Sequence, residues 1–166
     1  MKHTFLLPGK YRISNEPEVI ETLVGSCVAV CLYNTKNGRA AMNHFLRARP
    51  IEKSIYDIGE FGSTSTEYII KTLMKSDNNP SHYRAQVFGG AALIKSKSDS
   101  YNIGLNNVEI ALKTLAAYRI RVTKKEVGGE RGRRIKFDTE TKTIHCRFAG
   151  QVGKKYRNQA TNSDKT

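Results

Sequence analysis

Cys27 and His44 are the side chains in this sequence best suited to covalent chemistry. A thiol is nucleophilic as the thiolate, and a neighbouring imidazole can take its proton, so such a pair could attack an acyl carbon. Cys27 follows a turn of small residues, Gly25-Ser26. The backbone N–H groups of Ser26 and Cys27 in that turn are natural donors to a developing oxyanion. The residue types therefore suggest acyl transfer through a cysteine.

Two short apolar runs predict a β-hairpin that carries these two side chains. Residues 27–33 and 40–46 are too short for typical helices, and the first run is rich in β-branched and aromatic residues. The polar segment 34–38 between them is typical of a hairpin loop, with Gly38 free to take a positive φ. The hairpin would bring the thiol and the imidazole to the same end of one sheet.

The register of this hairpin decides whether the two groups meet. If Tyr33 and Arg39 are the last pair flanking the loop, His44 lies opposite Val28. A shift of one residue would instead place His44 directly across from Cys27. Because such a slip reverses the face of every side chain, the spacing alone leaves the contact open.

The cysteines also have a plainer interpretation. Free cysteine is among the most buried residue types, so Cys27 and Cys31 could simply be small apolar core residues. Three cysteines, an odd number, fit poorly with a disulfide framework and favour a reducing compartment. Neither Cys-x-x-Cys nor His-x-x-x-His occurs, so a metal site has little support.

Length and hydropathy predict one domain over residues 1–150, followed by a basic, flexible tail over 151–166. No apolar run approaches the roughly 20 residues that a membrane helix needs, and the start lacks the long apolar core of a signal peptide. We therefore expect no membrane insertion and a cytoplasmic location.

The net charge of +13 would attract nucleic acid, acidic membranes and acidic proteins alike. Eight basic residues lie between 119 and 136, but that segment has no aromatic residue on which a base could stack. A solvated hairpin face is the favoured interpretation, and no nucleic acid is expected. The alternative to an enzyme is a non-catalytic basic module for nucleic acid or an acidic protein, with the cysteines in its core.

The remaining periodicity predicts an α+β layered domain, mostly strands with two helices. Thr64 and Glu67 fit a capping box for the first helix, and a glycine pair, Gly89-Gly90, interrupts one strand. A polar loop is expected over 95–100. The elements expected outside the hairpin are strands within 5–24, over 84–94, 119–127, 134–138 and 143–148, and helices over 65–75 and 104–118.

Four ordered stretches resemble the chemoreceptor glutamine deamidases, the CheD family of bacterial chemotaxis. Together they cover roughly residues 10–148, and several ordered blocks are more specific than any single one. They are 22–33 with 38–45, then 87–91, 102–108 and 127–137.

This resemblance implies an active site of Cys27, His44 and Thr22. Some members carry the threonine six residues before the cysteine, where this chain has Glu21, so the neighbour of Thr22 remains an alternative. The resemblance also implies a sandwich of β-sheets with two helices packed outside. The residues expected near the substrate are Gly25, Asn43, Gly89 and Gly90.

The implied activity is conversion of specific glutamine side chains of methyl-accepting chemotaxis receptors to glutamate, with release of ammonia. No metal or organic cofactor is required. The family likeness adds cleavage of receptor methyl esters by the same thiol, and the chemotaxis phosphatase CheC as a partner. Transfer of the acyl group to an amine in place of water is a further alternative.

Overall fold

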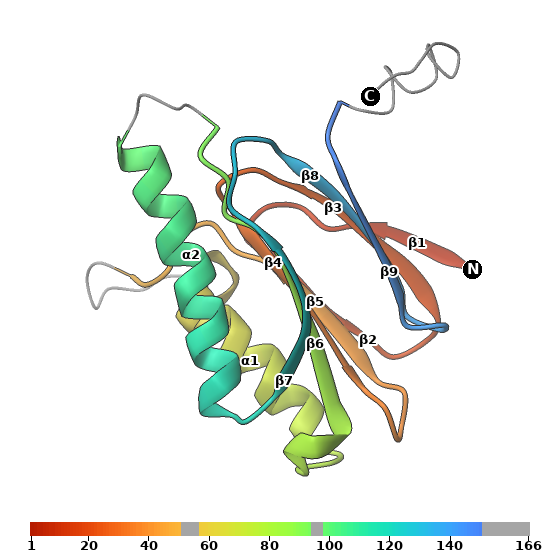
Figure 1. The fold of residues 1–166 in the computed structure, drawn as a ribbon. Helices are drawn as coiled ribbons and strands as arrows, with labels where there is room; N and C mark the ends of the chain where they lie inside the picture. The colour runs from red at the N-terminus through yellow and green to blue at the C-terminus, as the bar shows by residue number, and fades with distance from the viewer. Residues whose placement is uncertain (51–56, 94–97, 151–166) are drawn as a thin grey trace.

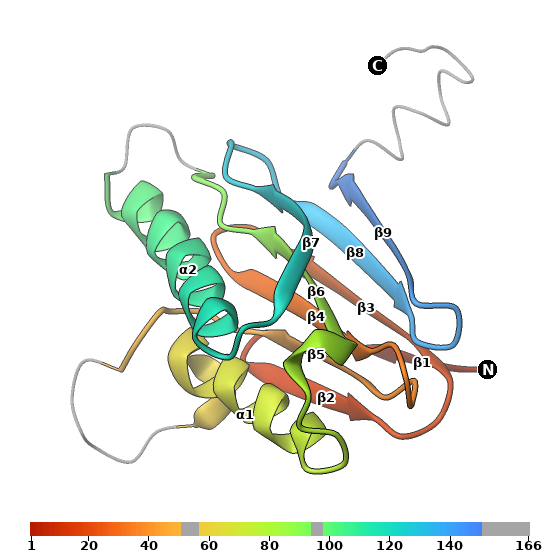
Figure 2. The same ribbon diagram turned by 60° about the horizontal axis from the view of Figure 1, so that its bottom comes forward.

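The fold has three layers: a four-stranded sheet, a five-stranded sheet packed against it, and two helices on the outer face of the second sheet (Figures 1 and 2). The computed structural model describes residues 1–50, 57–93 and 98–150, with the backbone alone over 98–102. The predicted α+β sandwich with two outer helices is confirmed. The predicted tail over 151–166 lies outside the described residues.

The two sheets are mixed. The pairs β1–β3 and β6–β7 are parallel and the other pairs are antiparallel. A parallel pair needs a long crossover, and helix α2 supplies it between β6 and β7. In order, the first sheet is β1 (Lys2–Phe5), β3 (Glu18–Val24), β8 (Arg133–Asp138) and β9 (Thr143–Phe148), and the second is β2 (Lys10–Ser14), β5 (Ala40–His44), β4 (Val28–Asn34), β6 (Tyr83–Gly89) and β7 (Arg121–Val127).

Helix α1 (Gly62–Met74) buries an apolar stripe, with Ile69, Ile70 and Leu73 fully enclosed. The predicted capping box was wrong. The helix begins three residues earlier than expected, with Phe61 as a cap that makes no side-chain hydrogen bond. The Thr64 hydroxyl instead donates to the Ile58 carbonyl at 2.6 Å, in the 3₁₀ turn η1 (Ile58–Glu60).

Helix α2 (Ser98–Ala117) begins six residues before the predicted start. The expected polar loop over 95–100 was therefore wrong from Ser98 onward, because serine and aspartate suit the first turn of a helix as well as a loop. Short 3₁₀ turn η2 (Pro80–His82) leads into β6. Among the described residues, no helix combines the length and apolar character needed to cross a bilayer.

Alternate residues of the central strand β4 enter two different cores. Val28, Val30 and Leu32 pack toward the helices, whereas Ala29 and Cys31 pack between the two sheets. This alternation follows from the pleat of a strand that is covered on both faces. It places every second residue of the Cys27 hairpin in the interior of the sandwich.

The strand register decides which face His44 takes. The predicted register was wrong by one residue, because Asn34 N, not Tyr33, closes the loop on the Arg39 carbonyl at 2.8 Å. Tyr33 therefore pairs with Ala40, and the bridge between Val28 and Phe45 continues the same register. Gly38 has the expected positive φ, +78°.

In this register His44 is level with Ala29 rather than with Val28. A one-residue shift considered from the sequence places His44 opposite Cys27. The observed shift is in the opposite direction, toward Ala29. Since residues two apart on a strand share a face, Ala29 and Cys27 face the same side. The imidazole and the thiol therefore lie on the same face of the sheet, toward the sandwich interior.

Candidate active site

Cys27 ends a turn immediately before β4, with its side chain half-buried against the core between the sheets. Three successive backbone carbonyls of this turn accept hydrogen bonds, two from the segment after β6 and one from helix α2. Ala91 N donates to the Gly25 carbonyl at 2.9 Å, and Gly90 N donates to the Cys27 carbonyl at 2.8 Å. The carbonyl between them, on Ser26, accepts from the side-chain Nδ2 of Asn107 at 2.9 Å. The turn that carries the thiol is thus fixed through its backbone.

The glycine pair after β6 makes these bonds geometrically available. Gly89 and Gly90 both have positive φ, +116° and +72°. A Cβ on Gly89 would stand 2.3 Å from the Cys27 carbonyl oxygen, so only glycine permits the approach. The pair therefore supports the Cys27 turn. Gly89 is the last residue of β6, within the strand predicted over 84–94, and its position near the substrate stays a prediction.

Asn43 also lies outside any loop. It is a fully buried residue of β5, and its side chain substitutes for part of the strand ladder. Its Oδ1 accepts from Val30 N at 2.8 Å, and its Nδ2 donates to Thr66 Oγ1 of α1 at 3.1 Å. Alternation along β5 turns this side chain toward the helix layer, away from His44, and its predicted position near the substrate stays a prediction.

Thr22 and His44 meet across the two sheets. Thr22 lies on β3 and His44 on β5, both are at most 1% exposed, and Thr22 Oγ1 is 2.7 Å from His44 Nδ1. The neighbouring Glu21 takes the other face of β3, where it pairs with Arg134 at 3.2 Å. Of the two residues considered for this position, Thr22 is the one that contacts the imidazole.

The Thr22 hydroxyl also fixes which ring nitrogen of His44 carries the proton. Its single hydrogen goes to the Leu6 carbonyl, 2.7 Å away, because a carbonyl can only accept. The contact with Nδ1 must then be a donation from the ring to Thr22. In the neutral imidazole this leaves a lone pair on Nε2, which is the form that a general base requires.

His44 Nε2 is buried and has no hydrogen-bond partner among the described residues. The thiol and the imidazole are therefore not hydrogen-bonded to each other in this structure. Burial lowers the pKa of His44 to about 4, so the ring is neutral at physiological pH. A neutral ring with a free lone pair on the thiol's side of the sheet can accept a proton from an approaching or reacting group.

Burial raises the pKa of the Cys27 thiol, and two smaller effects oppose it: the residue's own backbone N–H and the positive charge of Arg47. Together with the depressed pKa of His44, this makes the resting pair a thiol and a neutral imidazole. A preformed thiolate–imidazolium pair is disfavoured, so proton transfer would have to accompany attack on a substrate.

We expect iodoacetamide to modify the three cysteines in the order Cys27, Cys146, Cys31. Burial raises the pKa of Cys146 to about 11, and complete burial raises that of Cys31 further. Thiolate character and access decide alkylation rates. Timed labelling at neutral pH with peptide mass spectrometry measures the order. Uniformly slow labelling of all three would favour the non-catalytic module instead.

His44 should make the fold sensitive to mild acid. Its pKa is about 4 when folded and near 6.5 when unfolded, so between these values only the unfolded chain binds the proton. The free energy of unfolding therefore falls as pH drops from 6.5 to 4, by about 3 kcal/mol from this group, and no further below that. His44→Gln should lose this share of the pH dependence in urea unfolding, whereas the exposed His145→Gln should keep it. Equal slopes for His44→Gln and wild type would contradict the assignment.

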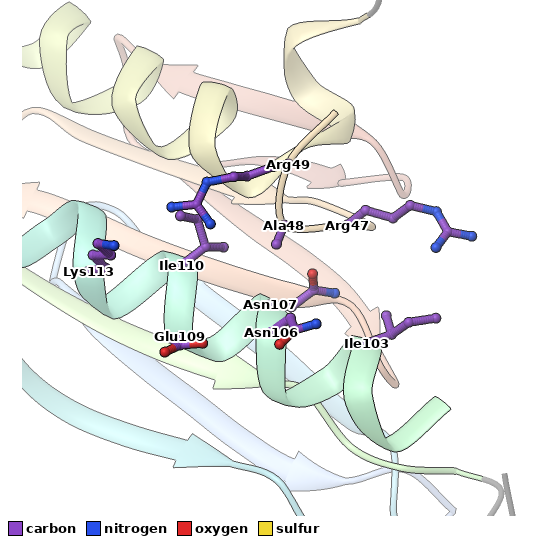
Figure 3. A pocket seen from close by; sticks show the side chains of 9 residues that line it. All are labelled: Arg47, Ala48, Arg49, Ile103, Asn106, Asn107, Glu109, Ile110 and Lys113. Atoms are coloured by element: carbon purple, nitrogen blue, oxygen red, sulfur yellow. The ribbon is translucent and has the colours of Figure 1, made fainter. Parts of the chain in front are cut away.

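A groove opens beside this site, between the segment after β5 and helix α2 (Figure 3). Its volume is about 450 Å³, and three cations line it against one carboxylate. The lining residues are Arg47, Ala48, Arg49, Ile103, Asn106, Asn107, Glu109, Ile110 and Lys113. Arg47 links the groove to the thiol, because its charge is close enough to affect Cys27. Within the described ranges, no three potential metal-ligating side chains gather anywhere.

The basic segment 119–136 does not form one continuous face. Its residues divide between β7 in one sheet and β8 in the other. Arg133 is only 6% exposed, donates to the Gly128 carbonyl at 3.0 Å and stacks on Phe148. Among the described residues, this segment therefore offers no continuous basic surface to a nucleic acid or an acidic protein.

Sequence reasoning missed two residues of this neighbourhood, Asn107 and Arg47. Asn107 lies in the family-like stretch 102–108, but the sequence assigns it no contact, although an asparagine on the buried side of a helix requires polar partners. It is fully buried, and its Nδ2 donates to both Ser26 and Leu46 carbonyls. The irregular connection 47–62, with Pro50 and mixed polarity, predicts a substrate-facing loop, but the sequence does not single out Arg47 within it.

Comparison with known proteins gives consistent matches. A family model described as CheD chemotactic sensory transduction matches residues 47–148. A Geobacter sulfurreducens protein named probable chemoreceptor glutamine deamidase CheD 1 is 34% identical over 150 residues, covering 86% of this chain and 75% of its own. A Trichlorobacter lovleyi protein named probable chemoreceptor glutamine deamidase CheD is 34% identical over 140 residues, covering 84% and 86%.

A Rhodospirillum rubrum protein of the same name is 35% identical over 147 residues, covering 89% of this chain and 82% of its own. About 18 residues of this chain remain uncovered, so the aligned span includes Thr22, Cys27 and His44, which precede the family-model match. The crystal structure of a Neisseria meningitidis protein, NMB0706, described as family-model DUF152, matches 78% of this chain and 64% of its own chain. The sequence identity is 8% and the TM-score is 0.43. A likeness of that size bears on neither the site nor the activity.

Proposed function

The chain belongs to the CheD family, and from this premise we propose that it is a cysteine-dependent amidohydrolase that converts glutamine side chains of methyl-accepting chemotaxis receptors to glutamate. Its relatives carry the name probable chemoreceptor glutamine deamidase. The observation that best supports the chemistry is the His44 ring on the same sheet face as Cys27, which Thr22 holds while Nε2 has no partner within the described part of the chain.

In the first half of the proposed reaction, the Cys27 sulfur attacks the carboxamide carbon while its proton moves to His44 Nε2. The new S–C bond pushes an electron pair onto the carboxamide oxygen, and the Ser26 and Cys27 N–H groups stabilise the resulting oxyanion. Collapse of this intermediate breaks the C–N bond. The imidazolium gives its proton to the departing nitrogen, which leaves as ammonia, and a thioester remains.

In the second half, water attacks the thioester carbon and His44 Nε2 takes a proton from it. Collapse breaks the S–C bond, the sulfur recovers its proton, and glutamate is released. Thr22 keeps the ring in the tautomer with a lone pair on Nε2 throughout. None of these steps needs a metal or an organic cofactor.

The groove beside the site suits the approach of a receptor helix. Arg47, Arg49 and Lys113 line it, and cations of this kind attract acidic residues that flank a target glutamine. Electrostatic steering of this sort raises the association rate and weakens with salt. The proposed substrate is therefore a glutamine on an acidic helical surface.

Incubation with a purified receptor cytoplasmic fragment tests the proposal. Each converted glutamine gains about 1 Da, and peptide mass spectrometry should locate the change while ammonia appears in equal amount. Conversion should weaken as salt is raised. Failure of the wild-type protein to convert any glutamine across several receptor fragments would overturn the proposed function.

The same assay separates related chemistry. Added primary amine tests transglutaminase-type transfer, because an amine that replaces water would become attached to the receptor. On the family likeness, we also propose that the thiol cleaves receptor methyl esters and that CheC is a partner. A methylated fragment and a pull-down with purified CheC test these two proposals separately.

A further inference from the structure

The carbonyls of the Cys27 turn are anchored by two different kinds of group. Backbone N–H groups hold the Gly25 and Cys27 carbonyls, whereas a side chain, Asn107 Nδ2, holds the Ser26 carbonyl. The Ser26 carbonyl belongs to the same peptide unit as the Cys27 N–H. Asn107 is therefore the one anchor of this turn, among those described, that substitution can remove.

The orientation of that peptide matters for acyl transfer. In a trans peptide the C=O and the N–H point in opposite directions, so holding the carbonyl at one side fixes where the N–H points. Burial raises the pKa of the Cys27 thiol, and the backbone N–H of the same residue is close enough to the sulfur to oppose that shift. An oxyanion formed on attack by that sulfur develops within reach of this N–H.

The packing of helix α2 places Asn107 next to this peptide. Gly104, one turn earlier, lies against the glycine pair so closely that a Cβ there would stand 2.4 Å from the Gly90 carbonyl oxygen. The helix therefore rests directly on the backbone that holds the turn. One turn further along, Nδ2 reaches the Ser26 and Leu46 carbonyls, both at 2.9 Å, which ties the nucleophile's turn to the segment that follows His44.

The acceptor end of Asn107 has no such partner. Its Oδ1 is buried and makes no hydrogen bond among the described residues, although the residue is 0% exposed. A buried acceptor without a partner costs about 1–3 kcal/mol, so it calls for a reason other than stability. The bond that Asn107 Nδ2 donates to the Ser26 carbonyl in the thiol's turn, together with the one to Leu46, supplies that reason. Figure 3 shows the side chain directed from α2 toward the Arg47–Ala48 segment.

We infer that Asn107 is a positioning residue that sets the oxyanion site: by holding the Ser26 carbonyl, it keeps the Cys27 N–H directed at the oxygen that becomes negative during acyl transfer. The inference rests on the proposed thiol chemistry at Cys27. It does not depend on which receptor or glutamine is the substrate.

Two probes of the full-length protein separate orientation of the N–H from reactivity of the thiol. Iodoacetamide alkylates a thiolate at a saturated carbon and forms no oxyanion, whereas p-nitrophenyl acetate acylates it through a tetrahedral oxyanion. The rate of each modification at Cys27 is measured by peptide mass spectrometry. In Asn107→Ala the ratio of acylation to alkylation should fall about tenfold or more, with alkylation little changed.

Asn106→Ala is the matched control, because Asn106 lines the same groove but is exposed and makes none of these bonds. Asn107→Gln, which retains a carboxamide on a longer arm, should give an intermediate ratio and serves if the alanine variant does not fold. A ratio equal to wild type in a folded Asn107 variant overturns the inference. A fall in the ratio alongside no receptor conversion by wild type would instead overturn the proposed function and leave this inference standing.

Discussion

Cys27→Ala should abolish glutamine conversion, by about 10⁴-fold or more, while the protein stays folded. Loss of a catalytic nucleophile removes the covalent route entirely, and comparable substitutions in thiol and serine enzymes have effects of this size. The thiol is half-buried and makes no described hydrogen bond to another side chain, so its removal leaves only a small cavity. The receptor-fragment assay by mass spectrometry measures the effect.

Cys146→Ala is the matched control for that experiment. Cys146 is also half-buried and packs against the same core between the sheets, but it lies on β9. It should keep wild-type conversion, and both variants should unfold cooperatively at similar temperatures. Undiminished conversion by folded Cys27→Ala would remove the proposed mechanism, whereas equal loss in both variants would point to damage to the shared core.

His44→Gln should lower the rate of conversion by about 10²–10⁴-fold, the range that a general acid–base group contributes. The side-chain N–H of glutamine can still donate to Thr22 Oγ1, as His44 Nδ1 does, but glutamine cannot shuttle a proton. In the wild type, the rate should fall only below about pH 5, as the ring becomes protonated near its lowered pKa of about 4. Initial rates across pH measure this. A profile centred near pH 6.5 would contradict it.

Thr22→Val separates placement of the ring from its chemistry. Valine has nearly the same shape but leaves His44 Nδ1 and the Leu6 carbonyl without their partner, so the ring can take the other tautomer. We expect a smaller loss than for His44→Gln. Thr139→Val is the control, because this hydroxyl is also buried and donates to the Glu18 carbonyl, far along β3 from the site. Equal effects of the two substitutions would assign Thr22 a structural role only.

Much of the architecture could be predicted from the sequence because the patterns involved are local. The hairpin runs, the apolar stripe of α1 and the final β8–β9 hairpin follow from periodicity within a few residues. The helix starts were the weakest predictions. Thr64 matched a capping box in the sequence, but its hydroxyl found the Ile58 carbonyl instead, in a turn that periodicity does not indicate.

By itself, the sequence determined which chemistry was available: a thiol after a small-residue turn, an imidazole on the returning strand, and ordered blocks shared with one family. Only the tertiary structure decided how these groups face one another. The observed register of β4 and β5 differs by one residue from the predicted register. This shift places His44 on the same face of the sheet as Cys27. The contact of Thr22 with His44, and that of Asn107 with Ser26, join segments 22 and 81 residues apart. Sequence spacing carries no information on such contacts, because they arise from the packing of separate layers.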